Sequence, residues 1–195
     1  FCGEGSVNII VPKTKAEEAL GVTLPNRRQE EWKWTDLRRM MDTAYATGAQ
    51  PQADAAAASR LLKAAPFASV AHSRIVLVNG VYDPKLSKAD GITVKASAAG
   101  FPVQDDIITI GSNLKPQGVS LRFEGSRDTP VEIIHVATKG EARAIATQHT
   151  IEVAAGGSAT LVETFVGEGD YLTVSSIAIT LGDGARLDRV KAECE

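Results

Sequence analysis

Apolar and polar residues are arranged differently on the two sides of residue 70. Before it, residues 25–65 mix charges of both signs and end in an alanine- and leucine-rich run over 53–65, a composition that favours helix. A shorter helix is predicted over 13–20, with Gly21 as its C-terminal stop. We therefore predict a mostly helical segment over residues 1–70.

From residue 71 onward the pattern is typical of β-structure. Short runs of β-branched residues are separated by Gly, Asn, Asp or Pro, without helical periodicity. Four such runs lie at 74–78, 91–94, 107–110 and 119–123. Residues 71–195 are therefore predicted to form a β-domain.

The last third of the chain contains an internal repeat. The pattern Ile-x-Val-x-x-Gly-x-x-Ala-x-Leu of residues 151–161 recurs at residues 177–187, which aligns Ile151 with Ile177. A looser copy at residues 121–131 aligns Leu121 with Ile151. In each copy, alternating apolar residues predict a strand with one buried face, and small residues let the chain bend before a second strand begins.

The copies are offset by 30 and 26 residues. A unit of 26 to 30 residues is too thin to bury its apolar face alone, so it must stack on a copy of itself. Stacking in one direction gives parallel strands about 4.8 Å apart, and the path around the coil supplies the crossover that parallel pairing needs. An antiparallel sandwich also fits short strands with frequent turns. The repeat favours a β-solenoid over that sandwich, and residues 119–192 lack the six-residue apolar period of a hexapeptide coil.

Composition narrows the possible functions. A formal net charge of -3 over 195 residues gives no field that attracts nucleic acid or anionic lipid, so neither is an expected partner. No apolar run approaches the roughly 20 residues that span a bilayer, and no signal-peptide pattern opens the chain. Cys2 and Cys194 lie at opposite ends of the chain and form no CxxC or Cys/His spacing, which is typical of inert thiols in a reducing, cytoplasmic location.

Two histidines are the first candidates for chemistry. His135 and His149 both fall in the β region and would approach each other if successive coils stack, and paired imidazoles bind iron or zinc. Neither has a carboxylate or thiol at a recognisable ligand spacing, and isolated strand histidines are more often surface or hydrogen-bonded residues. His72 is a weaker candidate. The pattern therefore assigns no metal ligand.

A loose acidic set suggests a different chemistry. Its members are Glu152, Glu163, Glu168 and Asp170. In a secreted β-helix such residues could hold calcium for polysaccharide cleavage, but the missing export signal argues against this carbohydrate-active alternative. A purely structural solenoid is a third interpretation. No catalytic residue is assigned.

Two tryptophans stand close together in the helical segment. Trp32 and Trp34 are two residues apart, which on a helix places them on different faces. We predict that one anchors this segment to the β-domain and that the other is partly exposed, where it is available to a protein partner.

Residues 24–37 read Leu-Pro-Asn-Arg-Arg-Gln-Glu-Glu-Trp-Lys-Trp-Thr-Asp-Leu, which resembles the N-terminal signature of SufD-like proteins. Residues 74–82, followed by Leu86-Ser87, resemble the family's first strand and hairpin, and residues 149–190 resemble the start of its core. From about Leu24 to its end the chain is thus similar to the SufB/SufD family of iron-sulfur cluster assembly scaffolds.

The resemblance implies a right-handed parallel β-helix preceded by helices, and a non-catalytic scaffold that acts with a SufB-like paralogue and the SufC ATPase. The family's cluster-forming residues and SufC-binding helices are expected beyond Glu195. The resemblance therefore assigns no catalytic, cofactor-binding or metal-binding residue here, and this fragment is expected to bind no cluster itself. Because an incomplete β-helix exposes strand edges, self-association through its open end is also predicted.

Overall fold

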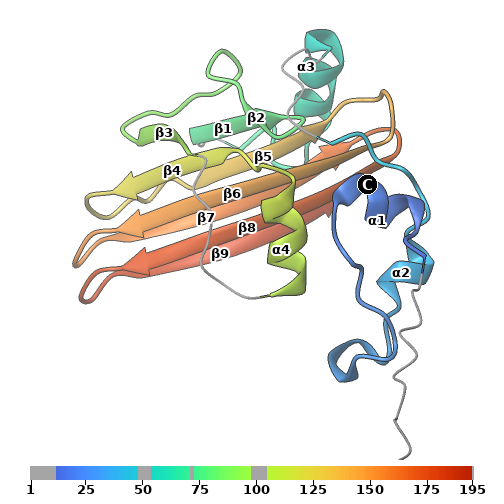
Figure 1. Ribbon diagram of the computed structural model, residues 1–195. Helices are drawn as coiled ribbons and strands as arrows, with labels where there is room; N and C mark the ends of the chain where they lie inside the picture. The colour runs from blue at the N-terminus through green and yellow to red at the C-terminus, as the bar shows by residue number, and fades with distance from the viewer. Residues whose placement is uncertain (1–11, 48–53, 71–72, 98–104, 195) are drawn as a thin grey trace, which may run out of the picture.

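The computed structural model describes residues 12–47, 54–70, 73–97 and 105–194. Within these ranges the helices are α1 (Lys15–Leu20), the 3-10 turn η1 (Glu30–Trp32), α2 (Leu37–Met40), α3 (Ala55–Ala64) and α4 (Asp106–Asn113). The strands are β1 (Ser73–Val78), β2 (Val81–Tyr82), β3 (Thr93–Ser97), β4 (Gly118–Phe123), β5 (Val131–Ala137), β6 (Arg143–Val153), β7 (Ser158–Gly167), β8 (Tyr171–Leu181) and β9 (Arg186–Cys194) (Figure 1).

The strands form two mixed sheets. The five-stranded sheet has the order β2-β1-β5-β7-β9, and the four-stranded sheet has the order β3-β4-β6-β8. From β4 onward, successive strands alternate between the two sheets, and each pairs in parallel with the next strand but one. The antiparallel pairs are β1 with β2 and β3 with β4. The described chain is therefore mainly β, as predicted, and its repeated segments lie in parallel partners.

The register of the sheets tests the sequence repeat directly. Leu121 pairs with Ile151, which confirms the alignment of the looser copy. Ile151 pairs with Ile179, however, so the predicted alignment of Ile151 with Ile177 is wrong by two positions. A shift of two positions keeps each side chain on the same face of its strand. The predicted assignment of inward and outward residues is therefore unchanged.

Turn geometry fixes the register that pairs Ile151 with Ile179. Gly156 and Gly184 lie at equivalent points of two stacked turns, with φ angles of 70° and 67° that favour glycine. The Gly156 N–H donates to the carbonyl oxygen of Asp183 at 2.9 Å, which joins one turn to the next. The sequence repeat aligns Gly156 with Gly182 instead. The stacked turns therefore favour the observed alignment over that of the sequence repeat.

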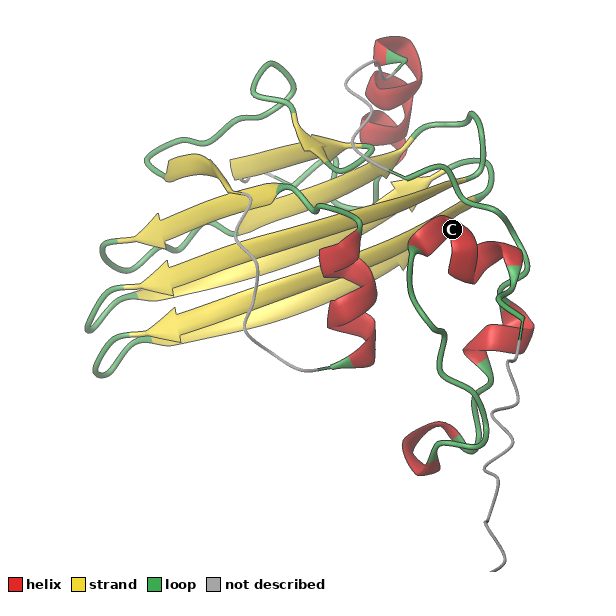
Figure 2. Ribbon diagram, viewed as in Figure 1, coloured by secondary structure: helices red, strands yellow, loops and turns green. Residues whose placement is uncertain are grey.

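Apolar side chains form three separate clusters around the sheets. The first lies between the sheets and contains Ile75, Leu121, Ile133, Ile151 and Leu161 among its fully buried members. The second packs α1 and α4 against the outer face of the four-stranded sheet. The third packs α3 against the outer face of the five-stranded sheet. Figure 2 shows the strands as the body of the molecule, with the helices lying outside it.

One predicted strand is a helix in the structure. Residues 107–110 lie in α4, although three of the four are isoleucine. The Asp105 carboxylate accepts hydrogen bonds from the N–H groups of Ile107 and Ile108 and so caps the helix, and Ile110 packs into the second cluster. The strand prediction at 107–110 is wrong because this cap and the packing of one helix face outweigh β-propensity.

Residues 25–47 contain less helix than predicted. α1 matches its prediction, with a capping box between Thr14 and Glu17 and Gly21 at a φ of 66°. α3 also lies where it was expected. Between them, η1 and α2 are the helical elements within residues 25–47, so a continuous helical region is not formed there. The division of the chain at residue 70 stays a prediction. No helix in the described ranges has the length and apolarity to cross a bilayer.

Candidate functional site

The space between the two sheets has an apolar end and a polar end. Inward positions of β5 read Val131, Ile133 and then His135, so the polar end lies where β5 and β7 finish. Because β6 runs back through the other sheet, its His149 lies at the same end. We call the side chains that meet there the polar cluster, which consists of His135, His149, Glu163, Ser175 and Arg189.

Glu163, on β7, joins the members of the polar cluster. Its side chain is fully buried, and the Ser175 hydroxyl of β8 donates to its Oε1 at 2.9 Å. The guanidinium of Arg189 on β9 donates to its Oε2. His135 Nε2 lies 3.4 Å from Oε1, an ion-pair distance. A carboxylate removed from water needs such partners to remain charged, and here they come from both sheets.

These contacts change the proton affinity of Glu163. Burial alone would raise its pKa, but the neighbouring imidazole of His135 and the guanidinium of Arg189 more than offset that effect and lower the pKa to about 2. The carboxylate is therefore ionised at neutral pH, and the hydrogen bond that it accepts from Ser175 joins the two sheets.

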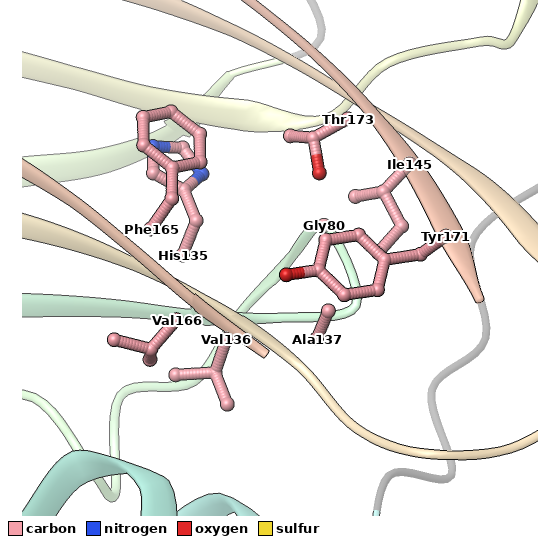
Figure 3. Close-up of a pocket in the computed structure, with 9 residues that line it drawn as sticks. All are labelled: Gly80, His135, Val136, Ala137, Ile145, Phe165, Val166, Tyr171 and Thr173. Carbon is pink, nitrogen blue, oxygen red and sulfur yellow. The ribbon is translucent and has the colours of Figure 1, made fainter. Parts of the chain in front are cut away.

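His135 is positioned by its neighbour in the five-stranded sheet. The register pairs His135 with Phe165, and their rings stack at a centroid distance of 4.3 Å and an angle of 2°. Figure 3 shows these two rings face to face, with Tyr171 and Thr173 across the space from them. A cavity of about 10 Å³ lies there, which has room for one water molecule at most.

His149, on β6, lies beside His135 in the polar cluster. Its side chain is fully buried, and Nδ1 accepts a hydrogen bond from the Val119 N–H at 3.1 Å, so the neutral ring carries its proton on Nε2. Burial, and then the proximity of His135, lower the pKa of His149 to about 3. The ring meets that of His135 edge to face at 5.2 Å. His149 is therefore a neutral imidazole in the folded protein.

The polar cluster does not present a set of metal ligands. Within the described ranges, both ring nitrogens of His135 and Nε2 of His149 are buried without a hydrogen-bond partner. The oxygens of Glu163 are already occupied by Ser175 and Arg189. Across the same ranges no group of three or more His, Cys, Asp or Glu side chains could hold a metal ion. The structure thus brings the two predicted histidines together, while their metal role stays an untested hypothesis.

The acidic set proposed from the sequence is not brought together. Glu163 lies between the sheets, while Glu152 is paired with Arg122 on an exposed face. Glu168 is paired at 2.7 Å with Arg60, which lies on α3. The calcium site that motivated the carbohydrate-active alternative is therefore not formed by these residues.

The remaining candidates lie away from the polar cluster. Trp32 donates from Nε1 to the Asp106 carboxylate at 2.9 Å and so ties the N-terminal segment to α4, whereas Trp34 is 85% exposed, as the prediction of one anchored and one exposed tryptophan requires. Cys194 is an exposed free thiol in β9. Cys2 and His72 lie outside the described residues.

Sequence reasoning missed Ser175 and Arg189. Neither belongs to a motif, because each reaches Glu163 only through the pairing of β7 with β9 and the stacking of the two sheets. A usable signal was present: each follows or precedes by two positions an apolar residue that packs between the sheets, Leu187 before Arg189 and Ile177 after Ser175. A polar residue at such a position predicts a buried partner elsewhere.

Comparisons with known proteins give two relatives. No protein-family model matches the chain. The iron-sulfur cluster assembly protein SufD of Escherichia coli K12 is 26% identical over 214 residues, covering 100% of this chain and 48% of the relative. An iron-sulfur cluster assembly SufBD family protein of Synechocystis is 33% identical over 88 residues, which are 44% of this chain and 18% of the relative. The chain spans about half the length of the first relative. These similarities support the SufBD family of iron-sulfur cluster assembly proteins and do not single out SufD.

Proposed function

We propose that this chain is part of a SufD-like, cytoplasmic scaffold that takes part in iron-sulfur cluster assembly without catalysing a reaction itself. Similarity to the Escherichia coli relative over the whole chain supports this function. The acidic set is dispersed, which removes the observation behind the carbohydrate-active alternative. The iron-sulfur cluster is the cargo of the assembly, and we assign it no ligand among these residues.

The architecture that fits this function is a right-handed parallel β-helix. The observation that carries this proposal is the alternation of β4 to β9 between two sheets, with parallel pairing of every second strand. Each coil of such a helix buries its apolar face only against the next coil. A scaffold of this kind offers partners a long, rigid surface and an edge of unpaired strands.

The surface that we propose for self-association of the isolated chain lies along β8 and β9. Each is the last strand of its sheet in the described chain. Ile179, Leu181 and Val190 on these strands are 43%, 47% and 48% exposed. Unpaired strand edges beside exposed apolar side chains favour pairing with another β-structure. In the isolated chain we expect this edge to pair with a second copy, while a SufB-like paralogue and a SufC-like ATPase are the partners that we propose for the longer protein from its similarity to the Escherichia coli relative.

Co-purification tests the proposed function. The longest form of the protein that the host encodes is affinity-tagged and purified anaerobically from that host, and a reporter iron-sulfur enzyme is assayed in cells that lack the protein. We expect a SufB-like paralogue and a SufC-like ATPase in the eluate, and low reporter activity that the untagged protein restores. A protein that purifies alone and leaves the reporter unchanged on deletion would instead be a structural solenoid unrelated to cluster assembly.

The isolated chain allows a narrower test of the proposed edge. We expect it to self-associate through β8 and β9, with a sedimentation coefficient that rises with concentration. Val190→Lys should reduce this association because a charge blocks edge pairing. Val70→Lys is the matched control, since Val70 is also 48% exposed but lies outside the sheets. A chain that is monomeric at all concentrations contradicts the proposed edge.

A further inference from the structure

A basic groove lies in the N-terminal part of the chain, far from the polar cluster in the sequence. It is a cavity of about 600 Å³ between α1, the segment of residues 23–28 and α2. Five cationic side chains line it, against the carboxylates of Glu17 and Asp36. Its net charge is therefore +3 in a chain whose formal net charge is -3. The volume lies within the usual range for small-molecule sites.

One ion pair forms the rigid base of the basic groove. Glu17 is 1% exposed and accepts hydrogen bonds from the N–H groups of Thr14 and Leu24, at 2.8 and 2.9 Å. Arg38 Nε lies 3.1 Å from each of its carboxylate oxygens. Burial would raise the pKa of Glu17, but these hydrogen bonds outweigh it and lower the pKa. Glu17 and Arg38 thus neutralise each other and fix α1 against α2.

The other four cations of the groove have no such partner. Within the described ranges, no carboxylate lies within ion-pair distance of Lys13, Arg27, Arg28 or Arg39. The carboxylate of Asp36 accepts the backbone N–H of Arg39 at 3.1 Å and so caps α2. Four unpaired positive charges around one cavity repel each other, and a bound anion would relieve that repulsion.

The backbone that carries two of these arginines is held in place. The Asn26 side chain accepts the N–H of Arg28 at 3.0 Å, and the Gln29 side chain accepts the N–H of Asn26 at 3.0 Å. The Arg38 N–H donates to the carbonyl oxygen of Pro25 at 3.2 Å, which joins this turn to α2. The groove is therefore largely formed before any ligand arrives, which lowers the entropic cost of binding.

We propose that the basic groove binds a ligand that carries two or more phosphate groups. Guanidinium groups present paired N–H donors that match phosphate oxygens, and three arginines outside the Glu17 ion pair surround the cavity. The hydroxyl groups of Thr14 and Thr23 line the same cavity and add neutral donors. This site goes beyond the proposed scaffold function and does not depend on it.

Calorimetric titration with inorganic pyrophosphate tests the site on the chain itself. We expect saturable binding at low ionic strength that weakens with added salt. The triple variant Arg27→Gln, Arg28→Gln and Arg39→Gln should bind at least about tenfold more weakly, because each substitution removes charge-assisted hydrogen bonds. All three side chains are exposed, so circular dichroism should show an unchanged fold.

The matched control removes the same charge elsewhere. Lys63→Gln, Lys88→Gln and Lys95→Gln together lie on exposed positions outside the groove and should leave pyrophosphate binding unchanged. Absence of binding by the unsubstituted chain, or equal losses in both triple variants, overturns the proposal. Citrate competing as well as pyrophosphate would overturn the assignment to phosphate. None of these outcomes bears on co-purification with assembly partners, so the two proposals fail separately.

Discussion

The two ends of the space between the sheets use the same strands in different ways. At the apolar end, Leu121, Ile151 and Leu161 bury surface without directional contacts. At the polar end, His149 and Glu163 occupy equally buried inward positions, but each needs a particular partner. The apolar end therefore stabilises many similar registers, whereas the polar end penalises any register that separates Glu163 from Ser175 and Arg189.

Shortening a buried side chain at the apolar end should cause the largest loss in the free energy of unfolding. Leu161→Ala leaves a cavity at a fully buried position and is expected to lower the free energy of unfolding by about 2–5 kcal/mol. Urea unfolding monitored by circular dichroism measures this loss in free energy. The control is Leu181→Ala, the same change at a 47% exposed position, which should cost about 0.5 kcal/mol or less. Equal losses in the two variants would mean that Leu161 is not in a closed core.

Removal of the charge at the polar end should have a smaller effect. Glu163→Gln keeps the side-chain volume but leaves Arg189 and His135 without their carboxylate, which is expected to lower the free energy of unfolding by about 1–3 kcal/mol. Glu152→Gln is the control, because Glu152 makes an exposed pair with Arg122 and should contribute little. Equal stabilities of the two variants, by the same urea unfolding, would remove the energetic role of the polar cluster.

Lowering the pH should lower the free energy of unfolding through the titrating groups of the polar end, because the leucine and isoleucine side chains of the apolar end do not titrate. His149 titrates near 6.5 when unfolded and near 3 when folded, so between these values the unfolded chain binds the extra proton. Its contribution is complete above pH 6.5 and is lost as the pH falls toward 3, with a slope of up to about 1.4 kcal/mol per pH unit. The lowered pKa of Glu163 acts in the same direction, from 4.5 down to about 2.

Unfolding measured from pH 7 to pH 5 isolates the histidine effect. His149→Asn should flatten the slope in this window, since asparagine keeps an acceptor for the Val119 N–H but does not titrate. The exposed carboxylate variant Glu124→Gln should retain the slope. A slope that survives in His149→Asn would assign the titration to another group.

Loss of a single neutral hydrogen-bond donor should cause the smallest loss in the free energy of unfolding. Ser175→Ala removes the hydroxyl that donates to Glu163, while Arg189 still pairs with the carboxylate. The expected loss in the free energy of unfolding is about 1 kcal/mol or less. In the background of Glu163→Gln the same substitution should cost less, and a double-mutant cycle measures that difference. Additive losses would mean that Ser175 and Glu163 do not interact.

The sequence by itself determined α1, α3 and the face that the repeated strands bury. Alternating apolar residues around Ile151 and Leu161 have only one inward face, and Gly21 ends α1 because its φ of 66° favours glycine. The approach of His135 to His149 also followed from stacking similar coils. The buried faces and the end of α1 depend on neighbouring residues, which a single sequence contains, and the contact of the histidines depends on the repeat.

Only the tertiary structure decided the register and the partners of the buried charges. Pairing Ile151 with Ile177 or with Ile179 preserves the same faces, so the sequence could not choose between them, and the stacked turns at Gly156 and Gly184 did. The packing of Ile110 in α4 and the reach of Arg189 to Glu163 likewise depend on residues distant in the chain. Burial and charge pairing act between residues that the fold brings together from distant parts of the chain. They can therefore outweigh the secondary-structure propensity of a short segment.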